Sequence, residues 1–185
     1  MSAQKSSSNI KNTVLIGMFA ALLAILSQLS IPMPSGVPIT LQTFAVALTG
    51  CILGWKAGTI STFVYLLLGA VGVPVFANFK GGIGALIGYT GGFLWGFLLM
   101  AFFCGLAIQK KNPILKIVFS ILGLFCCHFL GVIQYSFVAS VDLKASFLLV
   151  SFPYLLKDGI SVACAYFLSI LIRKRIVNLL PSMIY

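Results

Sequence analysis

Apolar residues dominate the chain in long continuous runs, and the segments between them are polar or rich in proline and glycine. Six apolar segments can be drawn, covering residues 13–29, 40–53, 57–71, 92–108, 114–139 and 145–172. Hydrocarbon forces every backbone polar group to pair within its own segment, and these runs do not alternate as the strands of a membrane barrel do. The pattern therefore predicts an all-α integral membrane bundle of six transmembrane helices, forming a single domain over residues 1–185.

Two of the connecting segments differ from ordinary loops. They read "SIPMPSGVPIT", after the first helix, and "GVPVFANFKGGIGALIGYTGG", after the third. Proline and glycine prevent either segment from forming one continuous helix. Both segments are also too apolar for a solvated loop. Irregular backbone is tolerated at a membrane where it is buried or lines a cavity, so we expect both segments to fold back onto the helices.

The composition agrees with a membrane protein. Of the 185 residues, 61% are hydrophobic and 8% are charged, whereas soluble domains are typically about 45–50% apolar and about 25% charged. The net charge is +10, but the basic residues are scattered, which argues against nucleic acid as a partner.

The five cysteines show no C-x-x-C spacing and are read as small buried side chains, not as metal ligands. The first apolar run lacks a cleavage site and is expected to be retained.

The distribution of Lys and Arg predicts the orientation. Nine of the twelve basic residues fall on the side that holds both chain ends, and cytoplasmic loops carry this excess. Residues 1–12 are therefore predicted to be a polar cytoplasmic tail, and residues 173–185 a basic cytoplasmic tail. On the opposite side lie Lys80 and Lys144, together with both segments rich in proline and glycine. A solute arriving from outside would meet these two segments first.

Lys157 and Asp158 are adjacent inside the last apolar segment, although the whole chain has only two acidic residues. Ionisable residues within a membrane are costly and usually mark function. Neighbours on a helix point about 100° apart, so each side chain is expected to address a different partner. The alternative is a lysine that extends toward the membrane surface while the aspartate binds a neighbouring helix. Asp142, in a short outer loop, is expected to be solvated.

Asn78 stands between two phenylalanines in "VFANFKGG". An amide both donates and accepts hydrogen bonds, and aromatic side chains commonly wall small-molecule sites, so this residue is a candidate ligand contact. A purely structural role in a turn is the alternative. His128, in the fifth segment, is expected to be a hydrogen-bonded packing residue, with a proton relay as the alternative.

No enzyme is predicted, because two acids and one histidine assemble none of the usual catalytic sets. The glycines of "KGGIGALIGYTGG" lack the G-K-[ST] ending of a phosphate loop, so the chain is not expected to use ATP by itself.

Three motifs together resemble one family. The runs "GVPITLQTFAVALTGCILG", "YLLLGAVGVPVFANFKGG" and "GYTGGFLWGF" are similar, in order and spacing, to the BioY family of biotin transporters. These are S-components, the substrate-binding subunits of energy-coupling factor (ECF) transporters. Tyr89 departs from the family, which more often has proline in G-P-T-G-G.

The resemblance implies a six-helix S-component fold in the bacterial cytoplasmic (inner) membrane, with biotin bound near the outer face and no cofactor. It implies that Asn78 and Asp158 contact the ligand. Lys157 is a plausible counter-charge for the carboxylate of biotin. Further pocket-lining residues are expected to be Phe76, Phe79, Tyr89, Gln42 and Tyr154. Ala20 and Ala24, four apart on one helix face, look like the surface offered to a transmembrane coupling subunit, which carries two ATPase subunits.

Two other functions stay open. A stand-alone secondary transporter would often show an internal repeat and broken helices at the membrane centre, and no convincing repeat is visible. A non-transporting scaffold subunit would have no reason to hold the Lys157–Asp158 pair and Asn78 at the same end of the bundle. Homo-oligomerisation is left open by the sequence.

Overall fold

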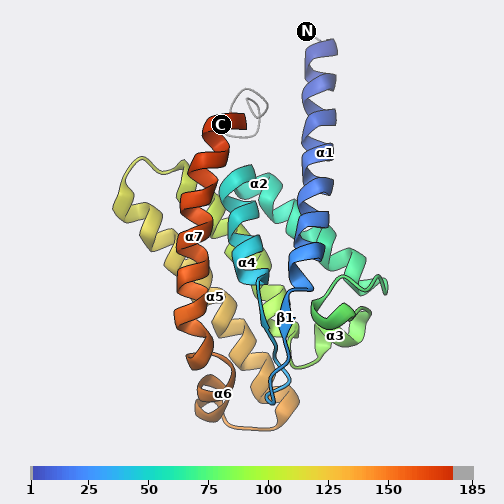
Figure 1. Ribbon diagram of the computed structural model, residues 1–185, viewed down its shortest axis with the longest axis vertical. Coiled ribbons are helices and arrows are strands. Elements are labelled where there is room, and N and C mark those ends of the chain that lie inside the picture. Colours follow the sequence, from blue (N-terminus) through green and yellow to red (C-terminus); the bar gives the residue numbers. More distant parts are fainter. Residues whose placement is uncertain (1, 177–185) are drawn as a thin grey trace.

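The structure is a computed structural model that describes residues 2–176. Most of this part is helical, and the helices form one bundle (Figure 1). Five of the helices in it are long and apolar enough to cross a membrane: α1, α2, α4, α5 and α7. The elements follow in the order α1 (Ser2–Ser27), β1 (Ser30–Ile31), β2 (Ile39–Thr40), α2 (Gln42–Ala70), the 3₁₀-helix η1 (Ala77–Phe79), α3 (Ile83–Ile87), α4 (Gly91–Gln109), α5 (Pro113–Ala139), α6 (Leu143–Val150) and α7 (Phe152–Ile176).

The second and third predicted segments are the two arms of one bent helix, α2. Gly54 interrupts the helical geometry with φ 78° and ψ 175°, a conformation open essentially to glycine alone. The two arms form an inverted V whose apex lies at the end of the bundle that also holds the start of α1 (Figure 1). Each arm is shorter than the roughly 20 residues that a spanning helix needs. Arg173 of α7 donates to the Cys51 carbonyl beside the bend (3.0 Å).

The prediction of one continuous sixth segment over residues 145–172 is wrong. The structure divides it into the short helix α6 and the spanning helix α7, with Ser151 between them at φ −121° and ψ −58°. Pro153, in the first turn of α7, has no N–H to donate and its ring obstructs the preceding turn, so a helix cannot run through it undisturbed. Asp142, expected to be merely solvated, caps α6 by accepting from the Ala145 N–H (3.2 Å).

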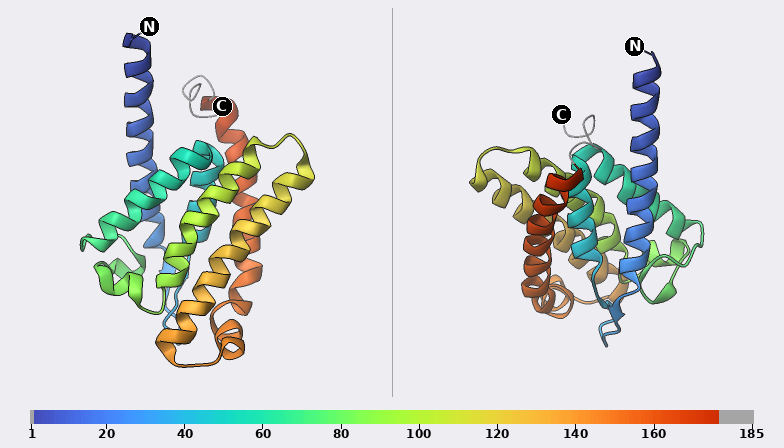
Figure 2. Two further views of the ribbon diagram at one scale, coloured as in Figure 1. Left: turned by 180° about the vertical axis from the view of Figure 1, so that it is seen from behind. Right: turned by 45° about the horizontal axis from the view of Figure 1, so that its top comes forward.

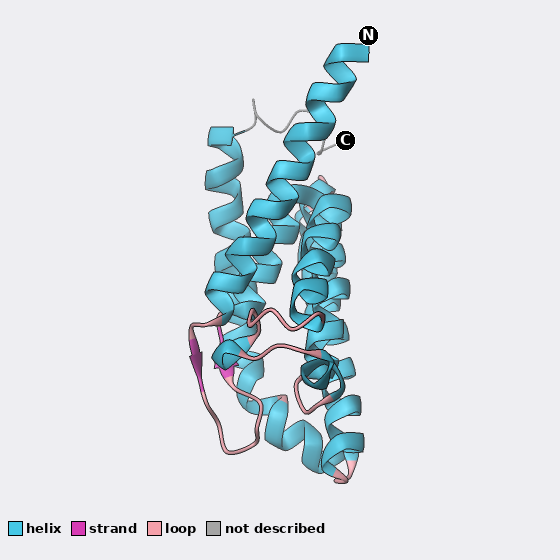
Figure 3. Ribbon diagram, turned by 90° about the vertical axis from the view of Figure 1, so that its right-hand side faces the viewer, coloured by secondary structure: helices cyan, strands magenta, loops and turns pink. Residues whose placement is uncertain are grey.

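Both segments rich in proline and glycine lie at the end of the bundle opposite the start of α1 and the end of α7 (Figures 1 and 3). The first forms a small hairpin, in which β1 and β2 pair antiparallel with Ser30 opposite Thr40. The second contains η1 and α3. Both contact the helices, as expected: Ser27 of α1 donates to the Val75 carbonyl (2.5 Å), and Tyr154 of α7 donates to the Val37 carbonyl (2.6 Å).

The ends of the chain are described only in part. Residues 2–12, expected as a polar tail, form the first turns of α1. Of the expected basic tail, residues 173–176 end α7 and residues 177–185 lie outside the described residues.

Helices α2, α4 and α5 pack closely at the centre of the bundle, and α4 lies beside α5 (Figure 2). Glycines on α4 permit this approach. A Cβ added at Gly105 would lie 2.4 Å from the Trp55 Cα, and one added at Gly96 would lie 2.6 Å from the Cys127 Cα. Helices in lipid gain no hydrophobic driving force from packing together. Small residues at their contacts let the backbones approach closely, so that van der Waals packing stabilises the contact. This packing brings α4 and α5 to the cavity described below.

Gly105→Ala should destabilise the protein by about 1–3 kcal/mol, because the added methyl overpacks the contact between α4 and the bend of α2. Thermal unfolding of the purified protein in detergent measures this. Gly17→Ala is the matched control, since a Cβ there meets nothing within 4 Å. Equal melting temperatures for the two variants would contradict the close-packing account.

Candidate functional site

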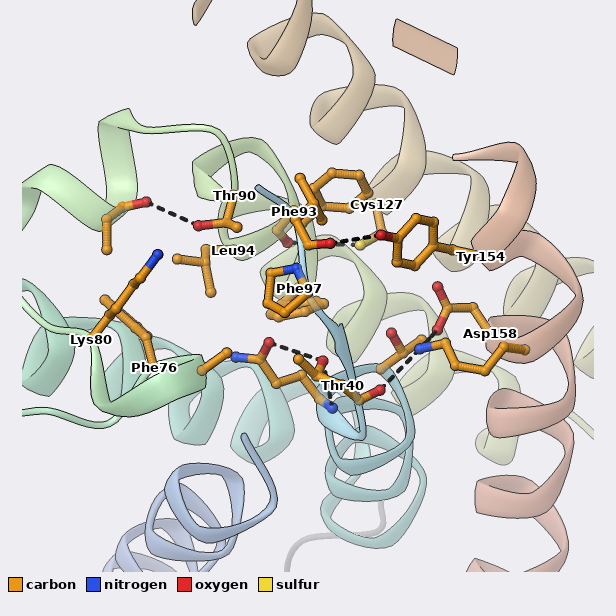
Figure 4. Close-up of a pocket in the computed structure, with 17 residues that line it drawn as sticks. Thr40, Phe76, Lys80, Thr90, Phe93, Leu94, Phe97, Cys127, Tyr154 and Asp158 are labelled. Carbon is orange, nitrogen blue, oxygen red and sulfur yellow. Dashed lines mark hydrogen bonds and ion pairs between the residues drawn. The ribbon is translucent and has the colours of Figure 1, made fainter. Parts of the chain in front are cut away.

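A cavity lies at the end of the bundle that carries the two irregular segments (Figure 4). It takes its walls from the hairpin, the start of α2, residues 76–80, α4, α5 and α7, and it encloses about 680 Å³, counting the space at its open mouth. Its lining residues are Val37, Pro38, Thr40, Gln42, Thr43, Phe76, Ala77, Lys80, Ala85, Thr90, Phe93, Leu94, Phe97, Cys127, Tyr154, Lys157 and Asp158.

Asp158 and Lys157 form the charged wall of the cavity. The Lys157 ammonium contacts Asp158 Oδ1 directly as an ion pair and also donates to the Thr40 carbonyl of β2 (2.9 Å). The expectation that each charge addresses a different partner is therefore wrong in this structure. The helical offset separates the two Cβ atoms, but the long and flexible lysine stem reaches back across it.

The Asp158 carboxylate keeps unused hydrogen-bonding capacity. Asp158 is 5% exposed, and its Oδ1 is fully buried. This oxygen forms the ion pair with Lys157, and Thr43 is a further hydrogen-bond partner of the carboxylate among the described residues. Buried acceptors in folded proteins nearly always have a partner, and a carboxylate oxygen can accept more than one hydrogen bond. A carboxylate on a cavity wall has lone pairs that a ligand N–H or O–H can share with these partners.

The preceding turn of α7 also holds the hairpin in place. Tyr154, which was predicted to line the pocket, does so, and its hydroxyl bonds to the Val37 carbonyl. Gln42, also predicted, lines the cavity at the start of α2. Its Nε2 donates to the Tyr65 hydroxyl (2.7 Å), and its Oε1 accepts from the Thr40 hydroxyl (3.1 Å). These bonds give the polar wall a fixed geometry.

Aromatic rings form the apolar walls. Phe76, a predicted lining residue, is 3% exposed and packs edge-on against Tyr65. Phe93 and Phe97 on α4 also line the cavity. Sequence reasoning missed these two, although "GGFLWGF" places them four residues apart, which is one face of a helix.

Phe79 and Tyr89 lie away from the lining. Phe79 is 72% exposed. Tyr89 is 46% exposed, and its ring packs on Tyr135 with 5.6 Å between centroids. The structure therefore brings together Phe76, Gln42, Tyr154, Lys157 and Asp158 of the predicted set, and does not bring Phe79 or Tyr89 to them.

Asn78 lies at the edge of the cavity. It is exposed and left-handed (φ 58°), and its Oδ1 accepts a hydrogen bond from the Ser30 hydroxyl (2.8 Å). The next backbone N–H, of Phe79, donates to Gln28 Oε1 (2.9 Å). Its neighbour Ala77 lines the cavity, whereas Asn78 itself does not. In this structure Asn78 helps to hold residues 74–80 against the end of α1.

Lys80 is a lining residue that sequence reasoning left unassigned. It lies on the side of the cavity away from Asp158 (Figure 4). Its position in "FANFKGG", two residues after Asn78, was the available signal. The cavity thus has a cation at one side and an ion pair at the other.

His128 of α5 contacts Asp158 from behind. Its Nε2 lies 3.3 Å from Asp158 Oδ2, and its Nδ1 lies 2.9 Å from the Ser151 hydroxyl. The predicted hydrogen-bonded packing role agrees with these contacts, but the sequence did not indicate that Asp158 is the partner. Among residues 2–176, no three His, Cys, Asp or Glu side chains gather as a metal site would require.

The predicted partner surface on α1 is largely covered. Ala20 is 1% exposed and packs in the core, and Ala24 is partly buried against that core. The structure thus places this face toward the bundle, so its contact with a coupling subunit stays a prediction.

The fold and the cavity define a class: a multi-pass helical membrane protein with a cavity, lined by apolar and charged residues, at one end of its bundle. A profile of the BioY family matches residues 1–178. The chain is 38% identical over 166 residues to the biotin transporter BioY of Thermotoga maritima, covering 89% of this chain and 97% of that one. It is 35% identical over 156 residues to a probable biotin transporter BioY of Pyrococcus horikoshii, covering 84% and 91%.

A solved crystal structure, of the S-component for biotin from an ECF-type ABC transporter, superposes with a TM-score of 0.82. The sequences are 27% identical, and the match covers 91% of this chain and 93% of that one. The chain belongs to the BioY family, which consists of transporter components and not of enzymes.

Proposed function

We propose that this protein binds biotin at the cavity and takes it up across the cytoplasmic membrane as the substrate-binding subunit of an ECF-type transporter. The observation that carries the proposal is the buried Asp158 carboxylate in the cavity wall of a BioY-family protein. The family relatives are biotin transporters, and the matched crystal structure is a biotin S-component.

The chemistry of biotin matches the walls of the cavity. Its ureido ring offers two N–H donors and one carbonyl acceptor. A carboxylate accepts an N–H in a charge-assisted bond, which is among the stronger kinds. Phe76, Phe93 and Phe97 offer apolar surface to the fused rings and the aliphatic tail. A site built to bond a ureido group rejects molecules that lack one, because its own polar groups would stay unpaired.

The carboxylate of biotin needs a cation, and the cavity offers two. Lys157 already contacts Asp158 and the Thr40 carbonyl. Lys80 is exposed, lines the cavity and lies on the side away from Asp158. We therefore assign the ligand carboxylate to Lys80, and to Lys157 the role of balancing the buried charge of Asp158.

Energy for uptake comes from partners. The proposal includes a transmembrane coupling subunit and two ATPase subunits, with both chain ends cytoplasmic and the cavity facing outward. The matched S-component of an ECF-type transporter supports this assembly, and the basic residues support the orientation. Uptake by the purified protein in vesicles without ATP would instead favour the stand-alone transporter.

Direct binding tests the proposal. Biotin should raise the melting temperature of the purified protein in detergent, since a ligand that binds the folded state stabilises it. Desthiobiotin retains the ureido group and should compete with labelled biotin, whereas lipoate has a carboxylate tail without the ureido group and should not. Equal competition by lipoate and desthiobiotin would contradict a ureido-reading site.

Asp158→Asn should weaken biotin binding roughly 10- to 100-fold, because hydrogen bonds to charged groups contribute about 1.5–3 kcal/mol. Isothermal titration measures the change. Asp142→Asn is the matched control, since Asp142 caps α6 away from the cavity lining. Parental affinity in the Asp158 variant would remove this residue from the site.

Asn78→Ala should also lower affinity, and the Ser30→Ala variant identifies the reason. If Asn78 contacts biotin, Ser30→Ala should bind nearly as well as the parent. If Asn78 acts only by fastening residues 74–80 through Ser30, the two variants should lose equal affinity. Parental binding by Asn78→Ala would exclude both roles.

Lys80→Met should weaken biotin roughly two- to fivefold, as expected for a partly solvated ion pair, and leave the affinity for biotin amide unchanged. Lys157→Met should weaken both ligands alike, because it leaves the charge of Asp158 unbalanced. Paired titrations with the two ligands measure this. The reverse pattern would show that the biotin carboxylate binds Lys157 and not Lys80.

A further inference from the structure

At the charged wall of the cavity, three buried polar side chains form one connected chain. His128 is 5% exposed, Ser151 is 0% exposed and Asp158 is 5% exposed. Asp158 lines the ligand cavity, whereas His128 and Ser151 line a separate apolar crevice between α5, α6 and α7. The polar connection from His128 to the ligand cavity therefore runs through the Asp158 carboxylate.

The hydrogen-bonding roles in this chain follow from its chemistry. The ionised carboxylate accepts only, so His128 Nε2 carries the hydrogen that it donates to Asp158 Oδ2 (3.3 Å). In a neutral imidazole the other nitrogen is then an acceptor, and Ser151 donates its hydroxyl hydrogen to Nδ1 (2.9 Å). The carboxylate thus sets the tautomer of the ring, Ser151 holds the ring through Nδ1, and the ring in turn holds one oxygen of the carboxylate.

The surroundings hold the ring in place. Phe93 of α4 meets His128 edge-on, with 5.8 Å between centroids and 89° between planes. Ser151 itself sits at the break between α6 and α7, where its N–H donates to the Phe147 carbonyl (3.0 Å). The helix break next to Pro153 therefore sets the direction of the Ser151 hydroxyl toward His128, a direction that a continuous helix would not give it.

The consequence concerns Asp158 Oδ1. Lys157 contacts this oxygen from the cavity side and could draw a free carboxylate toward itself. The bond from His128 to Oδ2 opposes that rotation. Side chains that bind a ligand are commonly held in position by hydrogen bonds from neighbouring residues. Metal-binding side chains depend on such neighbouring residues in the same way.

We propose that His128, held by Ser151, is a positioning residue that orients Asp158 for a ureido N–H of biotin. This rests on the proposed function. His128→Phe keeps an aromatic ring against Phe93 but removes both bonds, and should weaken biotin binding roughly tenfold or more. His128→Gln places an amide N–H near the position of Nε2 and should recover most of that loss.

A double-mutant cycle with Asp158→Asn tests the coupling. If His128 acts through the carboxylate, His128→Phe should cost less than about threefold further in the Asp158→Asn background, because coupled residues are not additive. The second readout is discrimination against biotin methylated on a ureido nitrogen. The parent should discriminate strongly and the His128→Phe variant weakly, whereas a general packing defect would weaken both ligands equally. Phe129→Leu, next along α5, is the control and should bind like the parent.

The outcomes separate the two hypotheses. Failure of the parent to bind biotin would overturn the proposed function and this inference with it. Parental binding with additive losses in the cycle, or with unchanged discrimination in His128→Phe, would overturn the positioning role alone.

Discussion

The structure depends on burying one carboxylate inside a membrane. An ionised aspartate within a spanning helix is costly, so the groups around Asp158 must compensate its charge. Asp158 obtains an ion pair from Lys157 on one oxygen and a hydrogen bond from His128 on the other. Removing either partner would leave an incompletely balanced buried charge, which is far more costly than an exposed one.

The residue that balances Asp158 also connects α7 to the cover of the cavity. Lys157 shares its ammonium between Asp158 and the Thr40 carbonyl, and this second bond connects α7 to the hairpin that covers the cavity. Tyr154, one turn earlier on α7, connects to the same hairpin at the Val37 carbonyl. The charged wall and its cover are therefore fixed to each other, and Asp158 stays in the cavity lining.

Much of this arrangement could be predicted from the sequence, for physical reasons. Continuous apolar runs predicted the helices α4 and α5 to within a residue at each end, because hydrocarbon leaves the backbone no alternative. The scarcity of acids singled out Asp158. The rest depends on tertiary contacts. Periodicity indicates that Phe93 and Phe97 share a face, but not which neighbour that face meets. The partner of His128 lies on a different helix, thirty positions later.

The wrongly predicted helix boundary and the wrongly predicted lining residue show that the sequence alone does not determine tertiary contacts. The break at Ser151 has a local cause, Pro153, but apolar character on both sides concealed it. Asn78 and Phe79 share a short motif with Ala77, yet a left-handed turn directs them away from the cavity that Ala77 lines. A motif thus identifies the segment that forms a site, and the backbone decides which of its side chains enter. For this cavity that choice favours Phe76 and Lys80, one on each side of the turn, and it leaves an aromatic ring and a cation at the wall facing Asp158. A ligand with hydrogen-bond donors at one end and a negative charge at the other would meet complementary groups at both ends, and its length would select among such molecules.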